Sequence, residues 1–351
     1  MELAALDYYY LVQEWQQLSG GRIQKIYLKD RLLVMQVYAK QNYEWLFTDG
    51  KSFLSSAKLA FPASPPGFCM FLRKRIQGFR IKKIELLGFD RIIKITVDAK
   101  EGELELIIEL LDKMNVLLCK DNNIISTFET HSYADRTIRG GTQYVPPPAR
   151  QAPWSKDLSA LEGKEAAKTL AVELGLGGKY AEEVCARKGI DRKDKLTKEQ
   201  LERVQKELEK LKSSTLHPVH NETEALPYPF KSKPGDWIST NTYSAAIDAI
   251  EAQYLETAEE RVEEKAAKEL LMKHEKVRAA QEKRMKELEE AITNNQLSGE
   301  KIYERYTELK ELLEGLKQDW KKLTFKELQD KYKDHKIVKA LRKDGTVELE
   351  L

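Results

Sequence analysis

RIKKIELLGFDRIIKITVDAKEGELELIIELLDKMNVLLC, residues 80–119, sets the fold class of this chain. It contains four strand-like runs, RIKKIELL, RIIKITVD, ELELIIEL and NVLLC, and in RIIKITVD and ELELIIEL apolar residues recur at every other position. This alternation is typical of strands that have one buried face. Turn signals at Gly88 and around Gly102 separate successive runs, so neighbouring strands are expected to pair antiparallel. The stretch therefore predicts an antiparallel sheet.

The residues before this stretch predict the rest of an α+β domain. Apolar residues at helical spacing indicate a helix over residues 3–18. Three short runs rich in β-branched and aromatic residues indicate strands: RIQKIYL (22–28), RLLVMQVYA (31–39) and EWLFT (44–48). PPGFCMFLRKRI, residues 65–76, predicts a second helix, because proline suits a first helical turn. We therefore place one domain dominated by antiparallel strands at residues 1–147.

The middle of the chain predicts a change of architecture. VPPPARQAP, residues 145–153, is expected to be an extended connector, since consecutive prolines favour the polyproline II conformation. Residues 154–215 predict an all-α domain that ends in the charged helix 198–212. Residues 216–242 are rich in proline, but their aromatic residues favour an ordered strap packed on a folded neighbour. These aromatic residues are Tyr228, Phe230 and Trp237.

Residues 243–343 predict a long antiparallel coiled-coil hairpin. Its first helix is expected to run to Thr293 without Gly or Pro, and NNQLSG, residues 294–299, to turn the chain. The apolar stripe of the outgoing helix is Val262, Ala266, Leu270, Val277, Leu288 and Ile292. The returning helix carries a seam with alternating steps of four and three: Ile302, Tyr306, Leu309, Leu313, Leu316, Trp320 and Leu323. Residues 344–351 alternate like a strand and are expected to begin a domain that is missing.

Net charge and cysteine count indicate which partners and which cellular compartment to expect. The chain has 351 residues and a net charge of +2, which gives no overall attraction to nucleic acid or membrane, so any such partner must bind a local patch. Its three cysteines are isolated in sequence, which is typical of a reducing compartment. Neither a signal peptide nor an apolar run long enough to span a membrane is recognised. We therefore expect a cytoplasmic protein without a membrane partner.

A basic run surrounds the turn between the first two strands of the opening stretch. It comprises Arg73, Lys74, Arg75, Arg80, Lys82, Lys83, Arg91 and Lys94. Such a cluster can neutralise phosphates and release their counterions, which is the main source of affinity for nucleic acid. The simpler interpretation is a solvated helix face and the outer faces of two strands. The functional interpretation requires that these side chains converge on one surface.

Two motifs offer more specific contacts with nucleic acid. Asp90 and Arg91 form either a plain hairpin corner or a pair in which the carboxylate orients the guanidinium toward phosphate. AVELGLGGKYAEEVC, residues 171–185, is similar to a helix-hairpin-helix element. In that element Gly175 and Gly177 would bring a helix N-terminus to a phosphate, with Lys179 adding charge. Its alternative is a helix hairpin that needs glycine only to turn.

The chain lacks recognisable catalytic chemistry. His217 and His220 stand in a proline-bearing loop without cysteine partners, so metal binding is not expected. Cys69 lies among apolar neighbours and is interpreted as a buried thiol. The sequence shows neither a phosphate-binding loop of the Walker type nor a serine elbow. We expect a protein that is not an enzyme and uses no cofactor, metal or small-molecule substrate.

Taken in order, five motifs resemble the NFACT family of ribosome quality-control factors, which includes the nuclear export mediator factor. They are FCMFLRKRIQGFRI (68–81), GFDRIIKI (88–95), IRGGTQYVPPP (138–148), GLGGKYAEEVC (175–185) and NTYSAAIDA (241–249). The resemblance covers nearly the whole chain. It implies an N-terminal domain folded like that of formamidopyrimidine DNA glycosylases, a helix-hairpin-helix domain and a coiled-coil arm.

The resemblance also implies a function. Members of the family bind obstructed large ribosomal subunits that carry peptidyl-tRNA, and they recruit aminoacylated tRNA. They support template-free addition of C-terminal tails, in which alanine is prominent. Its Asp-Arg pair, here Asp90 and Arg91, is tied to tRNA recruitment, and Arg73, Lys74 and Arg75 are the basic residues expected beside it.

Two departures from the family pattern stand out. Residues 111–115 keep only the asparagine of a basic-polar turn that ends in Ser-Asn, and the family's C-terminal RNA-binding domain is absent, which suggests a truncated form. Glycosylase chemistry is not expected, because the chain lacks the N-terminal proline and a four-cysteine zinc finger. Two alternatives stay open: a DNA-binding or DNA-processing protein, and a coiled-coil scaffold or adhesin.

Overall fold

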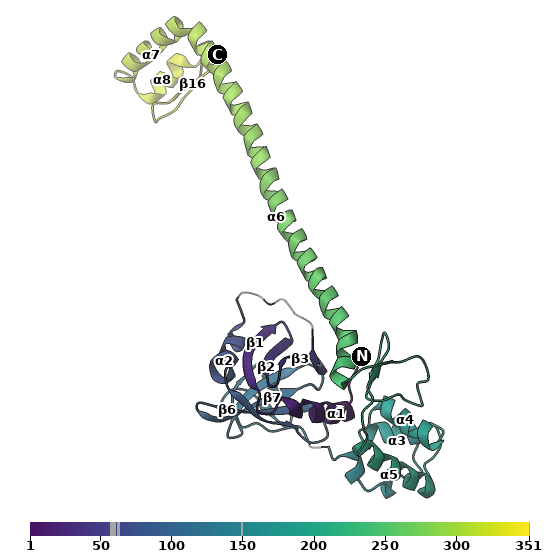
Figure 1. The fold of residues 1–351 in the computed structure, drawn as a ribbon. Coiled ribbons are helices and arrows are strands. Elements are labelled where there is room, and N and C mark those ends of the chain that lie inside the picture. Colours follow the sequence, from purple (N-terminus) through teal and green to yellow (C-terminus); the bar gives the residue numbers. More distant parts are fainter. Residues whose placement is uncertain (57–60, 62–63, 149, 351) are drawn as a thin grey trace. The chain divides into compact units, whose positions relative to one another are not determined.

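A computed structural model of the chain describes residues 1–56, 61, 64–148 and 150–350, except for the side chains of residues 252–270. The chain forms two compact units, Met1–Glu259 and Glu260–Leu351. Each unit is described by itself (Figure 1).

A nine-stranded sheet of antiparallel pairs dominates the first unit, in the order β4-β3-β2-β1-β5-β6-β7-β8-β9. Its strands are β1 (Arg22–Lys29), β2 (Leu32–Tyr38), β3 (Asn42–Thr48), β4 (Lys51–Ser55), β5 (Arg80–Leu86), β6 (Ile92–Ala99), β7 (Gly102–Glu109), β8 (Asn115–Lys120) and β9 (Asn123–Thr127). The predicted antiparallel sheet is confirmed, and the sequence prediction missed only the short strands β4 and β9. A single pairing, Arg22 with Arg80, joins β1 to β5, so the sheet consists of two consecutive meanders.

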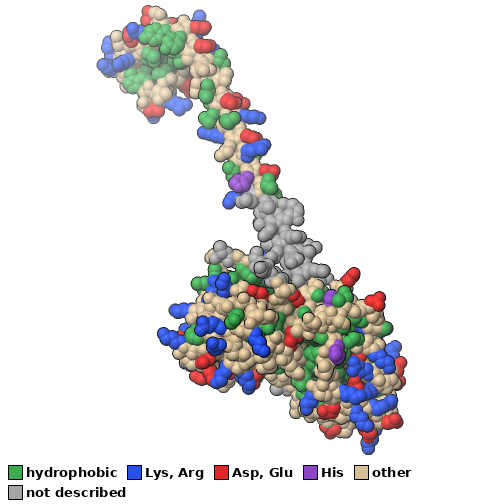
Figure 2. Space-filling model, viewed as in Figure 1, with side chains coloured by type: hydrophobic (Ala, Val, Ile, Leu, Met, Phe, Trp, Pro, Cys, Tyr) green, Lys and Arg blue, Asp and Glu red, His purple; other side chains and the backbone are tan. Residues whose placement is uncertain are grey.

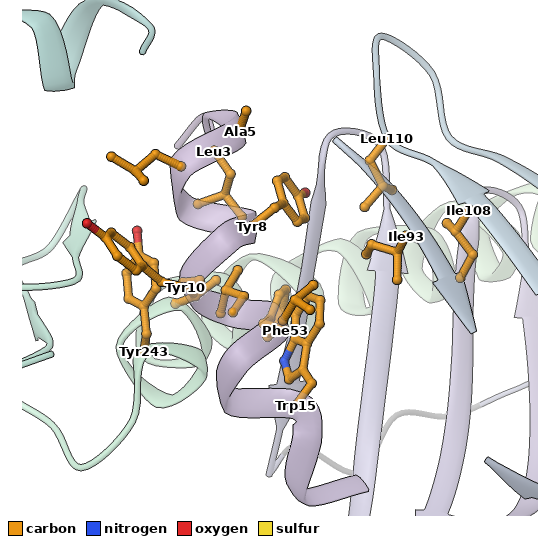
Figure 3. Close-up of a cluster of buried hydrophobic side chains, with 14 of the residues drawn as sticks. Leu3, Ala5, Tyr8, Tyr10, Trp15, Phe53, Ile93, Ile108, Leu110 and Tyr243 are labelled. Carbon is orange, nitrogen blue, oxygen red and sulfur yellow. The ribbon is translucent and has the colours of Figure 1, made fainter. Parts of the chain in front are cut away.

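Two helices contact the same large core as the sheet. They are α1 (Ala5–Trp15), which continues as a 3-10 turn (Gln16–Leu18), and α2 (Gly67–Ile76). Figure 3 shows Tyr8 and Trp15 of α1 on the side of the helix that faces the strands carrying Ile93 and Ile108. Both predicted helices are therefore present, and α1 is buried along most of its length.

The second face of the sheet is also covered over β6 to β9, which sequence alternation did not predict. Ile92, Ile107 and Leu117 form a separate buried cluster with Ile138 and Tyr144 from the segment that follows β9. That segment contains the short pair β10 (His131–Ser132) and β11 (Thr137–Ile138). Because these strands are covered on both sides, they carry apolar residues on both faces.

The helical segment and the strap share the core of the sheet domain. Their elements are 3-10 turns at Pro153–Ser155 and Ser159–Leu161, helices α3 (Ala166–Val172), α4 (Gly178–Lys188) and α5 (Lys198–Lys212), and the small sheet of β12 (Val219–His220), β13 (Ala225–Leu226) and β14 (Ile238–Ser239). In the strap, Tyr228 and Phe230 are buried and Trp237 packs against the core. The predicted boundaries at 147 and 215 do not separate cores, because one hydrophobic cluster crosses both.

The predicted turn at residues 294–299 is wrong, since α6 is one continuous helix, Tyr243–Glu304. Its first turns belong to the first unit, where Tyr243 and Ile247 are fully buried. Farther along, the side chains of Val277, Leu288 and Ile292 are about half exposed instead of lying in a coiled-coil interface. Val262, Ala266 and Leu270 of the predicted stripe lie outside the described side chains.

The second unit consists of the part of α6 from Glu260 onward and a small α/β module that follows it. It contains α7 (Tyr306–Trp320), α8 (Phe325–Tyr332) and a hairpin of β15 (Val338–Leu341) and β16 (Val347–Leu349). Leu316, a residue of the coiled-coil seam that the sequence predicts, instead packs with Leu328 of α8 and with Val338 and Leu341 of the hairpin. The strand predicted in 344–351 is therefore the partner of β15 in this module, which corrects its assignment to a separate domain.

Candidate nucleic-acid interface

The Asp90–Arg91 pair occupies a tightly held turn between β5 and β6. Gly88 has a positive φ of 64°, which an L side chain rarely adopts, and this lets the chain reverse direction. Asp90 Oδ1 accepts a hydrogen bond of 2.8 Å from the backbone N–H of Arg91. The carbonyl of Arg91 accepts another of 2.8 Å from the N–H of Leu110. The turn therefore presents its side chains from a fixed backbone.

The two side chains diverge, which corrects the hypothesis that the carboxylate orients the guanidinium of Arg91. Asp90 Oδ2 lies 3.7 Å from Nε of Arg150, and Arg91 Nη1 lies 3.8 Å from Oε1 of Glu2. Burial raises the pKa of Tyr8 well above its ordinary value, and the nearby charge of Arg91 opposes that shift. Arg91 thus lies close to the start of α1, whereas Asp90 faces the segment that follows the proline connector.

A groove opens beside this turn, with a volume of about 500 Å³. Its lining comes from α1, the turn and the segment after the connector: Tyr9, Val12, Gln13, Leu86, Gly88, Phe89, Arg150, Ala152 and Trp154. The ring of Trp154 lies 4.9 Å from that of Tyr9 and 5.5 Å from that of Phe89, measured between centroids. The groove is therefore largely apolar and aromatic, with Arg150 as its cation.

The three basic residues of α2 are held to different degrees. Arg73 donates from Nε to the carbonyl of Ile26 at 2.7 Å and lies over the ring of Tyr27. Arg75 pairs with Glu101 at 2.5 Å. Lys74 is exposed and has no ion-pair partner among the described residues. Only Lys74 therefore offers an uncommitted charge on this helix.

Acidic residues on neighbouring strands neutralise most of the remaining basic run. Lys82 pairs with Glu103, and Lys94 pairs with Glu105 at 3.2 Å. Lys94 on β6 reaches Glu105 diagonally, since its direct partner on β7 is Ile107, and Lys82 reaches Glu103 from β5 across the intervening strand β6. Figure 2 accordingly shows red acidic side chains among the blue basic ones on the visible face of this unit.

The basic residues do not converge on one surface, contrary to the expectation from sequence. Arg80 begins β5, whereas Asp90 and Arg91 follow its other end. A strand of seven residues at about 3.3 Å per residue separates these positions by about 20 Å. Arg80 and the Asp90–Arg91 turn therefore lie at opposite ends of β5.

The glycine turn between α3 and α4 has a left-handed backbone at two glycines and a buried setting. Gly175 and Gly177 have positive φ values of 74° and 76°. A Cβ at Gly177 would lie 3.3 Å from Cβ of Ala4, so this turn packs against the N-terminal segment. Nζ of Lys179 lies 2.7 Å from Oδ2 of the buried Asp7. The charge predicted to reach an external phosphate is therefore already engaged with an internal carboxylate.

Sequence reasoning missed the residues that make the groove. The sequence places Arg150 in the extended connector, Trp154 at the start of the predicted all-α domain and Tyr9 within the first predicted helix, without indicating a role for any of them. The backbone N–H of Phe89 donates to the carbonyl of Arg150 at 2.9 Å, which brings the connector beside the turn. An arginine and a tryptophan placed close after three prolines were the available local signal, but nothing in the sequence indicated where that segment would dock.

The sequence of this chain matches one family model and is similar to several known proteins. A family model described as NFACT N-terminal and middle domains matches residues 5–349. The archaeal Rqc2 homolog aRqcH of Methanocaldococcus jannaschii is 25% identical over 96% of this chain and 55% of its own length. The Rqc2 homolog RqcH of Streptococcus pneumoniae is 32% identical over 41% of this chain and 29% of its own length. The chain thus spans about half the length of the archaeal relative.

Solved structures show the same fold. The N-terminal part of the fibronectin/fibrinogen-binding protein of Streptococcus suis gives a TM-score of 0.61 at 23% identity, covering 72% of this chain and 100% of that chain. The fibrinogen binding protein of Staphylococcus aureus gives a TM-score of 0.55 at 22% identity, covering 70% of this chain and 97% of that chain. In the described part of the present chain, none of the helices combines the length and apolar character that a membrane span requires.

Proposed function

This chain belongs to the family of NFACT N-terminal and middle domains, and from that premise we propose that it is an RNA-binding factor of ribosome quality control. The names of its relatives support the process: they are called Rqc2 homologs in an archaeon and a bacterium, and a ribosome quality control complex subunit NEMF homolog in Drosophila melanogaster. In this proposal the protein binds RNA and has no catalytic role of its own.

The finer proposal concerns the partner of the first unit. The large ribosomal subunit with its peptidyl-tRNA is the proposed platform, and tRNA, including alanyl-tRNA, is the proposed ligand for C-terminal tailing. The observation that carries the proposal is the Asp90–Arg91 turn beside the groove. A rigid backbone there presents a carboxylate with 14% exposure, the Arg91 side chain with 25% and the Arg150 side chain with 62%. Guanidinium groups so placed suit contacts with phosphate and with base edges.

The test measures tRNA binding by the full chain with Arg91→Gln and Asp90→Asn, across a series of salt concentrations. Asparagine retains an acceptor for the Arg91 N–H, so the turn is preserved while its charge is removed. Arg91→Gln is expected to weaken tRNA binding and to reduce the slope of log K against log salt by about one. Arg139→Gln, at an exposed position on another segment, is the matched control for loss of one charge.

Duplex DNA of similar length distinguishes the DNA-binding alternative. A specific tRNA site binds tRNA much more tightly than duplex DNA at every salt concentration, whereas nonspecific electrostatic binding shows no such preference. Equal affinity for DNA and tRNA, or equal effects of Arg91→Gln and Arg139→Gln, would contradict the proposed tRNA site.

A further inference from the structure

We propose that α6 pairs antiparallel with α6 of a second copy of this chain. The contact is the helix face that carries Val277, Met285, Leu288 and Ile292, called the α6 stripe below. The inference goes beyond RNA binding and does not depend on it, because it concerns the second unit. It assigns a partner to apolar side chains that the fold leaves uncovered.

The described side chains of α6 in the second unit lie at the surface. In residues 271–304, every residue except Gly299 is exposed. The side chains of the α6 stripe have exposed fractions between 49% for Leu288 and 61% for Met285. Figure 2 shows hydrophobic side chains at the surface of this helix. Because tertiary packing of an apolar face supplies most of the stability of a helix in a protein, a helix of this kind gains from a partner.

The apolar residues of the α6 stripe lie on one side of the helix. From Val277 they follow at steps of eight, three and four residues. At about 100° per residue, these steps keep all four side chains within an arc of about 80°. Gln281 falls inside the same arc. A narrow apolar face on a charged helix is typical of a helix that packs on one other helix.

The net charge along the same stretch changes sign near its middle. Residues 273–286 contain six basic and two acidic residues, which gives a net charge of +4 with His274 neutral. Residues 287–304 contain one basic and five acidic residues, which gives a net charge of −4. The helix therefore has a basic half and an acidic half of equal magnitude.

This change of sign makes a second copy of α6 a complementary partner. An antiparallel pair centred between residues 286 and 287 sets each basic half beside the acidic half of the other copy, whereas a parallel pair sets like charges together. Packed helix axes lie about 8–10 Å apart, within the Debye length of about 10 Å at 0.1 M salt. The same alignment brings Met285 to the level of Leu288 in the second copy, so the apolar faces meet where the charges match.

Sedimentation equilibrium of the full chain over micromolar concentrations tests the proposal. We expect the average mass to rise with concentration from the chain mass of 40.5 kDa toward twice that value. The double variant Leu288→Gln, Ile292→Gln is expected to weaken dimerisation by more than about 100-fold, because each copy loses two apolar contacts. Glutamine is a good helix former, so α6 itself is preserved.

The double variant Met272→Gln, Leu297→Gln is the matched control. These side chains are also exposed, at 62% and 53%. Leu297 follows Leu288 by nine residues, which places it on the opposite side of the helix at about 100° per residue. The control is expected to dimerise like the wild-type chain. Equal losses in the two double variants would show that the α6 stripe is not the interface.

Spin labels report the orientation of the pair. Lys273→Cys and Lys286→Cys are labelled one at a time, since the three native cysteines are buried. In an antiparallel pair the two labels lie about 40 Å apart along the axis at position 273 but close together at position 286, given a rise of about 1.5 Å per residue. A short distance at both positions indicates a parallel pair and overturns the proposed orientation. Added salt should weaken the antiparallel dimer, because it screens the attraction between the two halves.

The mass of the wild-type chain decides the proposal. A mass that stays at 40.5 kDa at every concentration overturns it and leaves the α6 stripe to a helix of a different protein. Dimerisation that survives Leu288→Gln with Ile292→Gln overturns it as well. Binding of tRNA is measured separately, so failure of the dimer leaves the proposed RNA binding standing, and failure of RNA binding leaves the dimer standing.

Discussion

Nζ of Lys179 on α4 lies 2.7 Å from Oδ2 of Asp7 on α1, and the Asp7 side chain has no exposure to solvent. The other carboxylate oxygen accepts hydrogen bonds from the hydroxyls of Tyr180 and Tyr243, at 2.5 and 2.7 Å. One buried carboxylate therefore joins the sheet domain, the helical segment and the first turn of α6. Figure 3 shows Tyr243 beside Tyr10, on the flank of α1 away from the sheet.

Lys179→Met is expected to destabilise the first unit by about 3–5 kcal/mol, because it leaves Asp7 as an uncompensated buried charge. The double variant Asp7→Asn, Lys179→Met should lose less than the sum of the single variants. Urea unfolding checks this. Lys164→Met is the control, because its 2.7 Å pair with Glu173 is more than 40% exposed on both sides and should contribute about 1 kcal/mol or less. Equal losses for Lys164→Met and Lys179→Met would contradict the role of the buried pair.

Alanine substitutions at the two glycines of the turn before α4 are expected to lower stability by different amounts. Gly175→Ala and Gly177→Ala each place an L side chain at positive φ, which costs about 1–2 kcal/mol. A Cβ at Gly175 meets open space, whereas at Gly177 it presses on Ala4. We therefore expect Gly177→Ala to lower the thermal midpoint further than Gly175→Ala. The reverse order would show that Ala4 yields to the new methyl group without penalty.

The continuous helix α6 can be tested against the turn that sequence predicts. A Cβ at Gly299 meets nothing within 4 Å, so Gly299→Ala should stabilise a helix by about 0.5–1 kcal/mol. Asn295→Pro should break the helix at a cost of about 3 kcal/mol. Circular dichroism and hydrogen exchange across 285–304 measure both effects. A turn at 294–299 would instead tolerate the proline and gain nothing from the alanine.

Two buried glutamates predict loss of stability in acid. Burial tends to raise the pKa of Glu183, but the backbone N–H groups of Ser232 and Lys231 and the Arg187 side chain lower it overall. Burial likewise tends to raise the pKa of Glu207, but Lys188 and Arg187 lower it overall. Both folded-state pKa values lie below the unfolded value of about 4.3. The two glutamates therefore add to the free energy of unfolding above that pH, and this contribution is lost as the pH falls through the folded-state values.

Urea midpoints measured from pH 6 to pH 3 check this dependence. Glu183→Gln and Glu207→Gln should each flatten the fall in stability at low pH. Glu222→Gln, at an exposed position in the strap, should leave the curve unchanged. A wild-type curve that is flat between pH 5 and pH 3 would contradict the assignment.

Elements with local sequence signals could be predicted without the structure. Alternating apolar residues in 80–119 predicted consecutive antiparallel strands, because side chains on a strand point to opposite faces in turn. The aromatic residues of the strap predicted its burial. The family resemblance rested on five short motifs in order, and the family match over residues 5–349 confirms it.

Features that depend on residues far apart in the chain could be seen only in the folded protein. Sequence placed Lys82 and Lys94 in a basic patch, but folding of the sheet brings them to Glu103 and Glu105 on β7, with which they form ion pairs. Asparagine and glycine at 294–299 are turn signals, yet helix α6 continues through them, because such preferences are weak beside the continuity of a long helix. The groove near Asp90 exists because residues 150–154 return to the turn at residues 88–91, and only packing brings those two segments together.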